Sequence, residues 1–341
     1  MNNYILILIS AVISLISTPI IKRLAVKINA IDIPKDARRV HKKPIPLLGG
    51  LAIFVAFIIT LVLKKGVLEN SEIGIIAGSF IIVIGGVIDD IKELKPLTKL
   101  CFQLAAAICL IISGVSITVL TNPFDNINGF IHINWFYVPF TLFWVVGITN
   151  ALNLIDGLDG LAAGVALIST ATIFVIALIH GRTEAAILTS ILGGAIIGFL
   201  PYNFNPASIF MGDTGAQLLG FLLAAISMEG TIKSAAAFAI SVPILALGLP
   251  IYDTLFAMIR RKLNGKPMSQ GDRGHLHHRL LDLGLSQKQV VIIMYLFSAI
   301  LGGIAIIAMQ ISTVRSYFLM ASVIIVIVLV AWKLGFFKHV D

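Results

Sequence analysis

Charge is the scarcest property of this 341-residue sequence. Only 12% of its residues are Asp, Glu, Lys or Arg, about half the share found in soluble domains. Hydrophobic residues make up 58%, and no polar stretch is long enough to form a soluble domain. Because apolar runs of roughly 20 residues recur, each long enough to cross the hydrocarbon core of a bilayer, we predict one all-α, polytopic integral membrane domain over residues 1–341.

Cysteine and the common nucleotide-binding motifs are also scarce or missing. The only two cysteines, Cys101 and Cys109, fall eight residues apart in one apolar segment. In a helix they would be roughly 12 Å apart along the axis, which excludes a disulfide between them. The sequence has no P-loop, no G-x-G-x-x-G and no Ser-His-Asp arrangement, so these well-known nucleotide-binding and hydrolytic patterns do not apply.

Eleven apolar segments are predicted to span the membrane. They are residues 4–21, 48–63, 73–88, 99–120, 136–149, 160–180, 184–200, 214–229, 233–258, 289–309 and 314–332. The first has no basic residue before it and Lys22, Arg23 and Lys27 after it, which predicts a retained helix with its N-terminus outside. An odd number of crossings then leaves the C-terminus inside.

The distribution of basic residues agrees with this orientation. Of the 25 Lys and Arg residues, the outer segments hold only Lys64, Lys65, Arg182, Lys233 and Arg315. Positive residues concentrate on the cytoplasmic side of membrane proteins. Because the basic residues fall in loops between spans and form no binding stripe, the positive net charge does not indicate a nucleic-acid partner.

The ninth segment is longer than a bilayer needs and contains Pro243, Gly248 and Pro250. Proline and glycine favour a kinked or broken helix, and broken helices in membranes usually surround a cavity. A tilted helix that tolerates its prolines is the alternative. We therefore predict one broken or kinked helix near the active site.

Two adjacent carboxylates, Asp89 and Asp90, follow the third apolar run and are predicted at the inner membrane boundary. Adjacent carboxylates repel each other unless a cation compensates, and Mg²⁺ with phosphate oxygens is a natural compensating environment. The alternative is a solvated helix end whose charges pair with Lys92, Lys95 or Lys99.

A stripe of polar residues, Asn150, Asn153, Asp156 and Asp159, recurs at every third position. Such a spacing places the side chains on one slowly turning face of a helix. No basic residue is close to the stripe in the sequence. The stripe therefore predicts binding of a divalent metal or of a ligand's hydrogen-bond donors, with a solvated loop as the alternative.

The next inner loop contains Asn203, Phe210 and Asp213. Asp213 begins the eighth span, where an acid can cap the helix or bind a metal. Phe210 can pack at the membrane interface or stack on a flat ring. Both interpretations remain open from the residues alone.

The largest inner loop holds Arg273, His275, His277 and His278. No cysteine accompanies the histidines, and their spacing is not that of a zinc finger. Beside arginine they indicate phosphate-binding donors. The basic loop 38–43 either anchors the chain on the inner side or steers anionic substrates.

Carboxylates that hold Mg²⁺ and cations that clamp phosphates are the groups that phosphoryl transfer requires. In a membrane, one partner is expected to be a lipid phosphate. We predict that one active site is formed by the inner loops 22–47, 89–98, 150–159, 201–213 and 259–288.

On these motifs the sequence resembles the polyprenyl-phosphate N-acetylhexosamine-1-phosphate transferases over almost its whole length. The resemblance implies transfer of a sugar 1-phosphate from a UDP-sugar to undecaprenyl phosphate, with release of UMP, in the plasma membrane of a bacterium. It implies Mg²⁺ as cofactor, with Mn²⁺ as the other candidate ion. The form His275-Leu276-His277-His278 and the acid Glu93 favour the GlcNAc-type branch and UDP-GlcNAc.

The resemblance also implies a role for each motif. Catalytic roles are implied for Asp89, Asp90 and Asp156, metal binding for Asp213 and Asn153, and substrate binding for Asn150, Asp159, Asn203, Phe210, Arg273, His275, His277 and His278. Phospho-MurNAc-pentapeptide transferase and, in another class, a secondary transporter remain alternatives. The sequence leaves open whether the chain forms a homodimer and which cell-envelope glycopolymer it serves, with teichoic acid and lipopolysaccharide as candidates.

Overall fold

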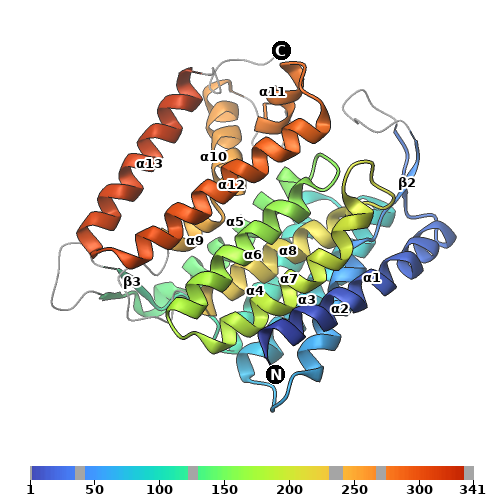
Figure 1. Cartoon of the computed structure of the whole chain (residues 1–341), viewed down its shortest axis with the longest axis horizontal. Coiled ribbons are helices and arrows are strands. Elements are labelled where there is room, and N and C mark those ends of the chain that lie inside the picture. The colour runs from blue at the N-terminus through green and yellow to red at the C-terminus, as the bar shows by residue number, and fades with distance from the viewer. Residues whose placement is uncertain (1, 35–42, 122–129, 230–240, 266–273, 334–341) are drawn as a thin grey trace.

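The structure is a computed structural model that describes residues 2–34, 43–121, 130–229, 241–265 and 274–333 (Figure 1). The helices are α1 (Asn3–Lys27), α2 (Gly50–Leu63), α3 (Asn70–Lys92), α4 (Pro96–Ile112), α5 (Tyr137–Ile155), α6 (Leu161–Ile179), α7 (Thr183–Asn203), α8 (Gly212–Ser227), α9 (Ser241–Ala246), α10 (Gly248–Leu263), α11 (Leu276–Asp282), α12 (Gln287–Gln310) and α13 (Thr313–Lys333). A short 3₁₀ helix, Asn134–Phe136, precedes α5. Two antiparallel pairs complete the fold, β1 (Ile31–Asp32) with β2 (Ile45–Pro46) and β3 (Val119–Thr121) with β4 (Phe130–His132).

The predicted all-α, multi-pass membrane class is confirmed. Within the described ranges, seven helical segments are long and apolar enough to cross a membrane, namely α1, α3, α5 with its preceding 3₁₀ turn, α6, α7, α12 and α13, and α2 and α4 are shorter apolar helices. The count of eleven spans stays a prediction. Cys101 and Cys109 both lie in α4 and are free thiols, as predicted.

The fourth span, predicted as residues 99–120 with an earlier end at Ser113-Gly114 as the alternative, is shorter than 99–120 and follows the alternative. Helix α4 ends at Ile112, because Gly114 adopts a left-handed φ of 86° and the chain reverses there. The Gly114 N–H donates to the Ile111 carbonyl and the Val115 N–H to the Leu110 carbonyl. These two bonds are the usual termination of a helix by a left-handed glycine, and the chain then leads into β3.

The break predicted in the ninth segment is confirmed for its described part, residues 241–258. Helix α9 ends at Ala246 and α10 begins at Gly248, which places Pro250 in the first turn of α10, where its missing N–H costs nothing. The Ser169 hydroxyl of α6 donates to the Ala246 carbonyl at 2.7 Å. This bond pairs a backbone oxygen that the break would otherwise leave without a partner in an apolar interior. Residues 233–240 lie outside the described ranges.

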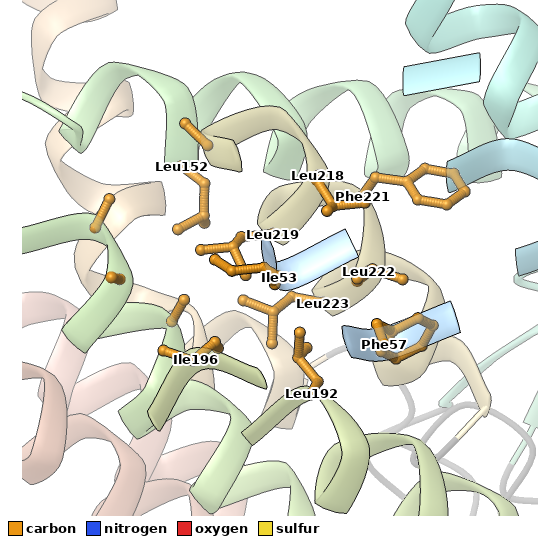
Figure 2. Packing of buried hydrophobic residues seen from close by; sticks show 14 of the residues in the cluster. Ile53, Phe57, Leu152, Leu192, Ile196, Leu218, Leu219, Phe221, Leu222 and Leu223 are labelled. Carbon is orange, nitrogen blue, oxygen red and sulfur yellow. The ribbon is translucent and has the colours of Figure 1, made fainter. Parts of the chain in front are cut away.

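Helix α8 lies at the centre of the fold and packs against α2, α3, α5, α6 and α7. Its side chains are buried on every face except at Asp213, as expected for a helix that is apolar all round. Figure 2 shows the packing around it, with side chains from α2, α5 and α7. The labelled residues are Ile53, Phe57, Leu152, Leu192, Ile196, Leu218, Leu219, Phe221, Leu222 and Leu223.

Glycines let neighbouring backbones approach α8 closely near its N-terminal end. A Cβ added to Gly50 of α2 would lie 2.2 Å from Gly215 Cα, and one added to Gly86 of α3 would lie 2.4 Å from Thr214 Cα. Small residues at such crossings are the usual way for membrane helices to pack tightly. The fold thereby brings the polar end of α3 against the first turn of α8.

Candidate active site

A cavity of about 910 Å³ lies at this end of α8. Among the predicted site residues it is lined by Asp89, Asp90, Asp156, Asp159, Asn203, Phe210, Asp213 and His278. Its further lining includes Asn29, Asp32, Lys99 and Gln287. Residues that are separated by up to about three quarters of the chain, such as Asn29 and Gln287, therefore meet in one cavity. This convergence supports the prediction of a single site.

Asp90 binds the first turn of α8. Its carboxylate accepts hydrogen bonds from the N–H of Asp213 at 2.8 Å, from the N–H of Thr214 at 3.2 Å and from the Thr214 hydroxyl at 2.6 Å. Gly212 has a φ of 69°, and a Cβ at this position would lie 2.4 Å from an Asp90 oxygen. Asp90 thus serves as the N-terminal cap of α8, where the helix dipole favours a negative charge, and its oxygens hold Asp213 in place.

Lys99 of α4 bridges two carboxylates from different helices. Its ammonium lies 2.5 Å from Asp89 Oδ2 and 2.5 Å from Asp213 Oδ2. The other Asp89 oxygen accepts from the Leu94 N–H at 2.6 Å, and the other Asp213 oxygen accepts from the Asn153 amide at 3.1 Å. From the sequence, Lys99 is only one of three lysines whose charge can pair with Asp89 and Asp90. Nothing in the sequence shows that Asp213 lies on the other side of Lys99.

Asp156 directly follows α5 and faces the same cavity. Burial, followed by the negative charges of Asp213, Asp90 and Asp159, raises the pKa of Asp156 to about 8. Its carboxylate accepts no hydrogen bond from any residue that the structure describes. A cation placed among these carboxylates would relieve the repulsion and favour the ionised form of Asp156.

The donor set fits Mg²⁺. Among the described residues, no three acidic, histidine or cysteine side chains are close enough together to form a complete protein cage for a metal. Mg²⁺ does not need such a cage, because it usually takes one or two carboxylates and completes its shell with water and substrate phosphates. Asp213 and Asp156 offer carboxylate oxygens of this kind, and Asn153, whose amide N–H donates to Asp213, has an amide oxygen as a further candidate ligand.

Asp159 and Asn205 together join three segments on another wall of the cavity. One of its oxygens accepts from the Asn205 amide at 3.0 Å and from the Ala207 N–H at 2.9 Å. The Asn205 amide also donates to the Gln287 side chain of α12 at 2.7 Å. Asp159 therefore holds the loop between α7 and α8, in addition to facing the cavity.

The same loop is held from two further sides. The buried Asn203 amide donates to the Ile209 carbonyl at 3.1 Å. The backbone of Phe210 donates to the Pro46 carbonyl at 2.8 Å and accepts from the Gly49 N–H at 2.9 Å. These bonds fix the backbone that presents Phe210 to the cavity.

The three histidines differ in their surroundings. His275 Nδ1 lies 2.7 Å from a carboxylate oxygen of Asp253 in α10, and the Leu276 N–H donates to the other oxygen at 2.8 Å. His277 is only 2% exposed, its ring packs against those of His275 and His278, and its ring nitrogens form no hydrogen bond with any described residue. His278 lines the cavity. Of the predicted histidine donors, only His278 reaches the cavity in this structure.

Burial, with a smaller effect of His278, lowers the pKa of His277 to about 3, so its ring is uncharged at neutral pH. The His277 ring packs against Gly157, where an added Cβ would lie 2.5 Å from Nε2. His277 therefore joins α11 to the loop that carries Asp156. Arg273, the other predicted donor of this loop, lies outside the described residues.

Asn150, like His275 and His277, does not line the cavity. Its amide donates to the Gln103 side chain at 2.7 Å and to the Val146 carbonyl at 2.8 Å. Because α5 continues to Ile155, Asn150 lies inside the helix. The three-residue spacing of Asn150, Asn153, Asp156 and Asp159 does not show where α5 ends, so it could not predict which of these residues lie inside the helix.

Comparison with known proteins shows similarity along nearly the whole chain. A model of glycosyl transferase family 4 matches residues 72–231, the part that carries Asp89, Asp90, Asp156, Asp159 and Asp213. The probable undecaprenyl-phosphate N-acetylglucosaminyl 1-phosphate transferase of Bacillus subtilis is 41% identical over 329 residues, which cover 96% of this chain and 91% of that protein. The decaprenyl-phosphate N-acetylglucosaminephosphotransferase of Mycobacterium tuberculosis is 36% identical, over 86% of this chain and 79% of that protein.

A third relative covers less of the chain. The phospho-N-acetylmuramoyl-pentapeptide-transferase of Lacticaseibacillus paracasei is 37% identical over 203 residues, which cover 55% of this chain and 62% of that protein. Of these three relatives, the two that match over most of the chain have names that specify N-acetylglucosamine. The family model and the 41% identity to the Bacillus subtilis transferase show that the chain belongs to glycosyl transferase family 4.

Proposed function

We propose that this protein transfers GlcNAc 1-phosphate from UDP-GlcNAc to undecaprenyl phosphate, giving undecaprenyl-diphosphate-GlcNAc and UMP. The observation that carries the proposal is the meeting of distant acidic and amide residues in one cavity of about 910 Å³ beside apolar helices. The names of the relatives that match over most of the chain support the choice of sugar and lipid. The muramyl-pentapeptide reaction is the second candidate, supported by a match of about half of the chain.

Mg²⁺, with Mn²⁺ as the other candidate, would be held by Asp213 with Asn153 and Asp156 beside it. When bound, the metal would neutralise charge on the diphosphate during the transfer. The cluster of carboxylates around the first turn of α8 supports this assignment, because among the described residues Lys99 is the one basic side chain that forms ion pairs with it.

In the reaction we favour, an oxygen of the lipid phosphate attacks the phosphorus that carries the sugar. The bond from this phosphorus to the bridging oxygen breaks, and UMP leaves with the bonding electrons. A phosphate monoester has a second pKa near 6, so the lipid phosphate is mostly a dianion at neutral pH and needs little help from a base. Asp89 and Lys99 would then position the phosphate and balance its charge.

The nucleotide is assigned to the wall formed by Asp159, Asn203 and Phe210. An aromatic ring can stack on uracil, and amide and carboxylate groups match its hydrogen-bonding edge. His278, with Arg273, would bind the diphosphate. The backbone hydrogen bonds of Phe210 with Pro46 and Gly49 support this assignment, because a preorganised binding site loses less entropy when the ligand binds.

The cavity is proposed to face the cytoplasm of a bacterium, with the N-terminus outside and the C-terminus inside the plasma membrane. The small number of basic residues in the predicted outer segments supports this orientation. Figure 1 is consistent with it, since α1 begins at the end of the molecule opposite α11. The product would enter the synthesis of a cell-envelope glycopolymer such as teichoic acid or lipopolysaccharide.

The test is a panel of radiolabelled UDP-sugars with purified full-length protein, undecaprenyl phosphate and Mg²⁺, with and without EDTA. We expect UMP and a labelled lipid from UDP-GlcNAc, and neither after EDTA. A preference for UDP-MurNAc-pentapeptide would establish the second candidate. Uptake of a solute into vesicles without UMP release would indicate a transporter instead.

A further inference from the structure

Three amide side chains from three helices form a hydrogen-bonded group inside the apolar core. The Asn150 amide donates to Gln103 Oε1 at 2.7 Å, and the Gln103 amide donates to Gln217 Oε1 at 3.1 Å and to Asn150 Oδ1 at 3.3 Å. Gln103 is 1% exposed and Gln217 is 3% exposed. We call Gln103, Asn150 and Gln217 the amide layer.

The amide layer lies one helical turn away from three residues of the site. Gln103 follows Lys99 by four positions in α4, Asn150 precedes Asn153 by three in α5, and Gln217 follows Asp213 by four in α8. Residues three or four apart occupy the same face of a helix. The layer therefore repeats, one turn deeper, the contacts of Lys99 and Asn153 with Asp213.

Polar groups are costly in an apolar interior unless they are paired, so the three amides favour one relative register of α4, α5 and α8. A shift of one helix by a single residue is about 1.5 Å, enough to break these bonds. The same shift would move Asp213 away from Lys99 and Asn153. The apolar residues that pack around α8 are less selective, because dispersion contacts have no preferred direction.

We propose that the amide layer positions the metal-binding and phosphate-binding groups, and that Gln103 is its central residue because it bonds both of the others. Gln103, Asn150 and Gln217 are thus positioning residues that act through Lys99, Asn153 and Asp213. The proposal rests on the proposed function in its assignment of a divalent metal to Asp213.

A matched control lies on α5 and α8, the two helices that Gln103 joins to α4. The Trp144 ring N–H of α5 donates to the Ser227 hydroxyl of α8 at 3.2 Å, so Ser227→Ala also removes a buried hydrogen bond between helices. Ser227 follows Asp213 by 14 positions in the sequence, which is roughly 21 Å along a helix. If the amide layer contributed to folding alone, its variants and Ser227→Ala would have the same effect on metal binding.

The experiment measures Mn²⁺ binding by electron paramagnetic resonance in purified full-length protein, together with the thermal unfolding midpoint. We expect Gln103→Met to weaken Mn²⁺ binding by about tenfold, as for other residues that orient metal ligands, and Gln217→Met to weaken it less, because it removes one bond. Ser227→Ala should bind Mn²⁺ as the wild type does. The affinities should follow this order even where the unfolding midpoints of the variants are similar.

Wild-type affinity in Gln217→Met and in a folded Gln103→Met, or equal weakening in Ser227→Ala, would overturn the proposal and leave the metal site intact. Absence of Mn²⁺ binding by the wild-type protein would instead refute the metal assignment under the proposed function, and the positioning role would fall with it. If Gln103→Met does not fold, the Mn²⁺ affinity of Gln217→Met tests the proposal. That variant removes only the bond between Gln103 and Gln217 and keeps the two bonds between Gln103 and Asn150.

Discussion

Helices α8 and α13 are both apolar, but α8 is buried at the centre of the fold and α13 is exposed at its edge. Helix α8 is enclosed by five other helices and presents Asp213 at its exposed end. Helix α13 lies at the edge of the bundle beside α12 (Figure 1), with Phe318 74% exposed and Leu329 57% exposed. Apolar composition alone therefore does not distinguish a helix that positions a site from one whose surface is available to lipid.

The difference between them lies in what surrounds the apolar residues. Around α8, glycines such as Gly86 permit close backbone approach, and buried polar groups such as Gln217 form bonds between helices. Most of the side chains that α13 exposes are large and apolar. The comparison predicts that equivalent substitutions will have large effects near the first turn of α8 and small ones on the exposed face of α13.

The largest effect is expected at the end of α8 itself. Asp213→Ala should reduce UMP release by at least about a thousandfold, as the loss of a main electrostatic contact to a transferring phosphoryl group does in other enzymes. Asp282→Asn, at the exposed end of α11, is the control and should keep wild-type activity. Comparable activity in the two variants would rule out a role of Asp213 in the transfer.

Lys99→Met should have the next largest effect, lowering the turnover number by roughly a hundredfold, because it leaves Asp89 and Asp213 without their shared cation. Lys95→Met, at the start of the same helix, is the control for loss of one positive charge from α4. Steady-state kinetics with varied undecaprenyl phosphate measure the effect. If Lys95→Met lost as much activity, general charge and not the bridge would be responsible.

Gly212→Ala tests the backbone that carries Asp213. Its φ of 69° and the 2.4 Å approach to Asp90 leave no room for a methyl group, and strain of about 1–3 kcal/mol is expected from such a position. Both the thermal unfolding midpoint and the activity should fall. Gly303→Ala in α12, where an added Cβ meets nothing within 4 Å, should be neutral or slightly stabilising.

The smallest effect is expected on α13. Leu219→Ala in α8 removes a fully buried side chain and should cost about 2–5 kcal/mol, whereas Leu329→Ala in α13 should change the unfolding midpoint in detergent very little. Thermal unfolding of the two variants under one condition compares them directly. Equal destabilisation would show that α13 packs against a partner, and a homodimer would then be the first explanation to examine.

Much of this organisation could be predicted from the sequence. The recurring apolar runs predicted a multi-pass helical protein, and Pro243, Gly248 and Pro250 predicted the break between α9 and α10. The polar clusters at the ends of these runs predicted residues that line the cavity, including Asp89 and Asp213. These predictions succeeded because charge and proline are costly inside membrane helices.

Other features depend on contacts between distant segments. The residues next to Lys99 in the sequence indicate the start of a helix. They do not predict the ion pair of Lys99 with Asp213, which is more than 100 positions away. Asn150 and Asn153 share one stripe, yet one bonds Gln103 and the other bonds Asp213. The histidine loop likewise contains one residue that faces the cavity and one that is buried against Gly157. Only the packing of α4, α5, α8 and α11 decides these roles.

The most direct test of the account is a double-mutant cycle on UMP release from UDP-GlcNAc, with wild type, Asp89→Asn, Lys99→Gln and the double variant. Residues that act as one unit give strongly non-additive losses. Because Lys99 joins Asp89 to Asp213 in one cavity, we predict that the double variant loses about as much activity as the worse single variant. If the factor by which the double variant slows UMP release equalled the product of the two single factors, the result would contradict a single site in which Asp89 and Lys99 act together.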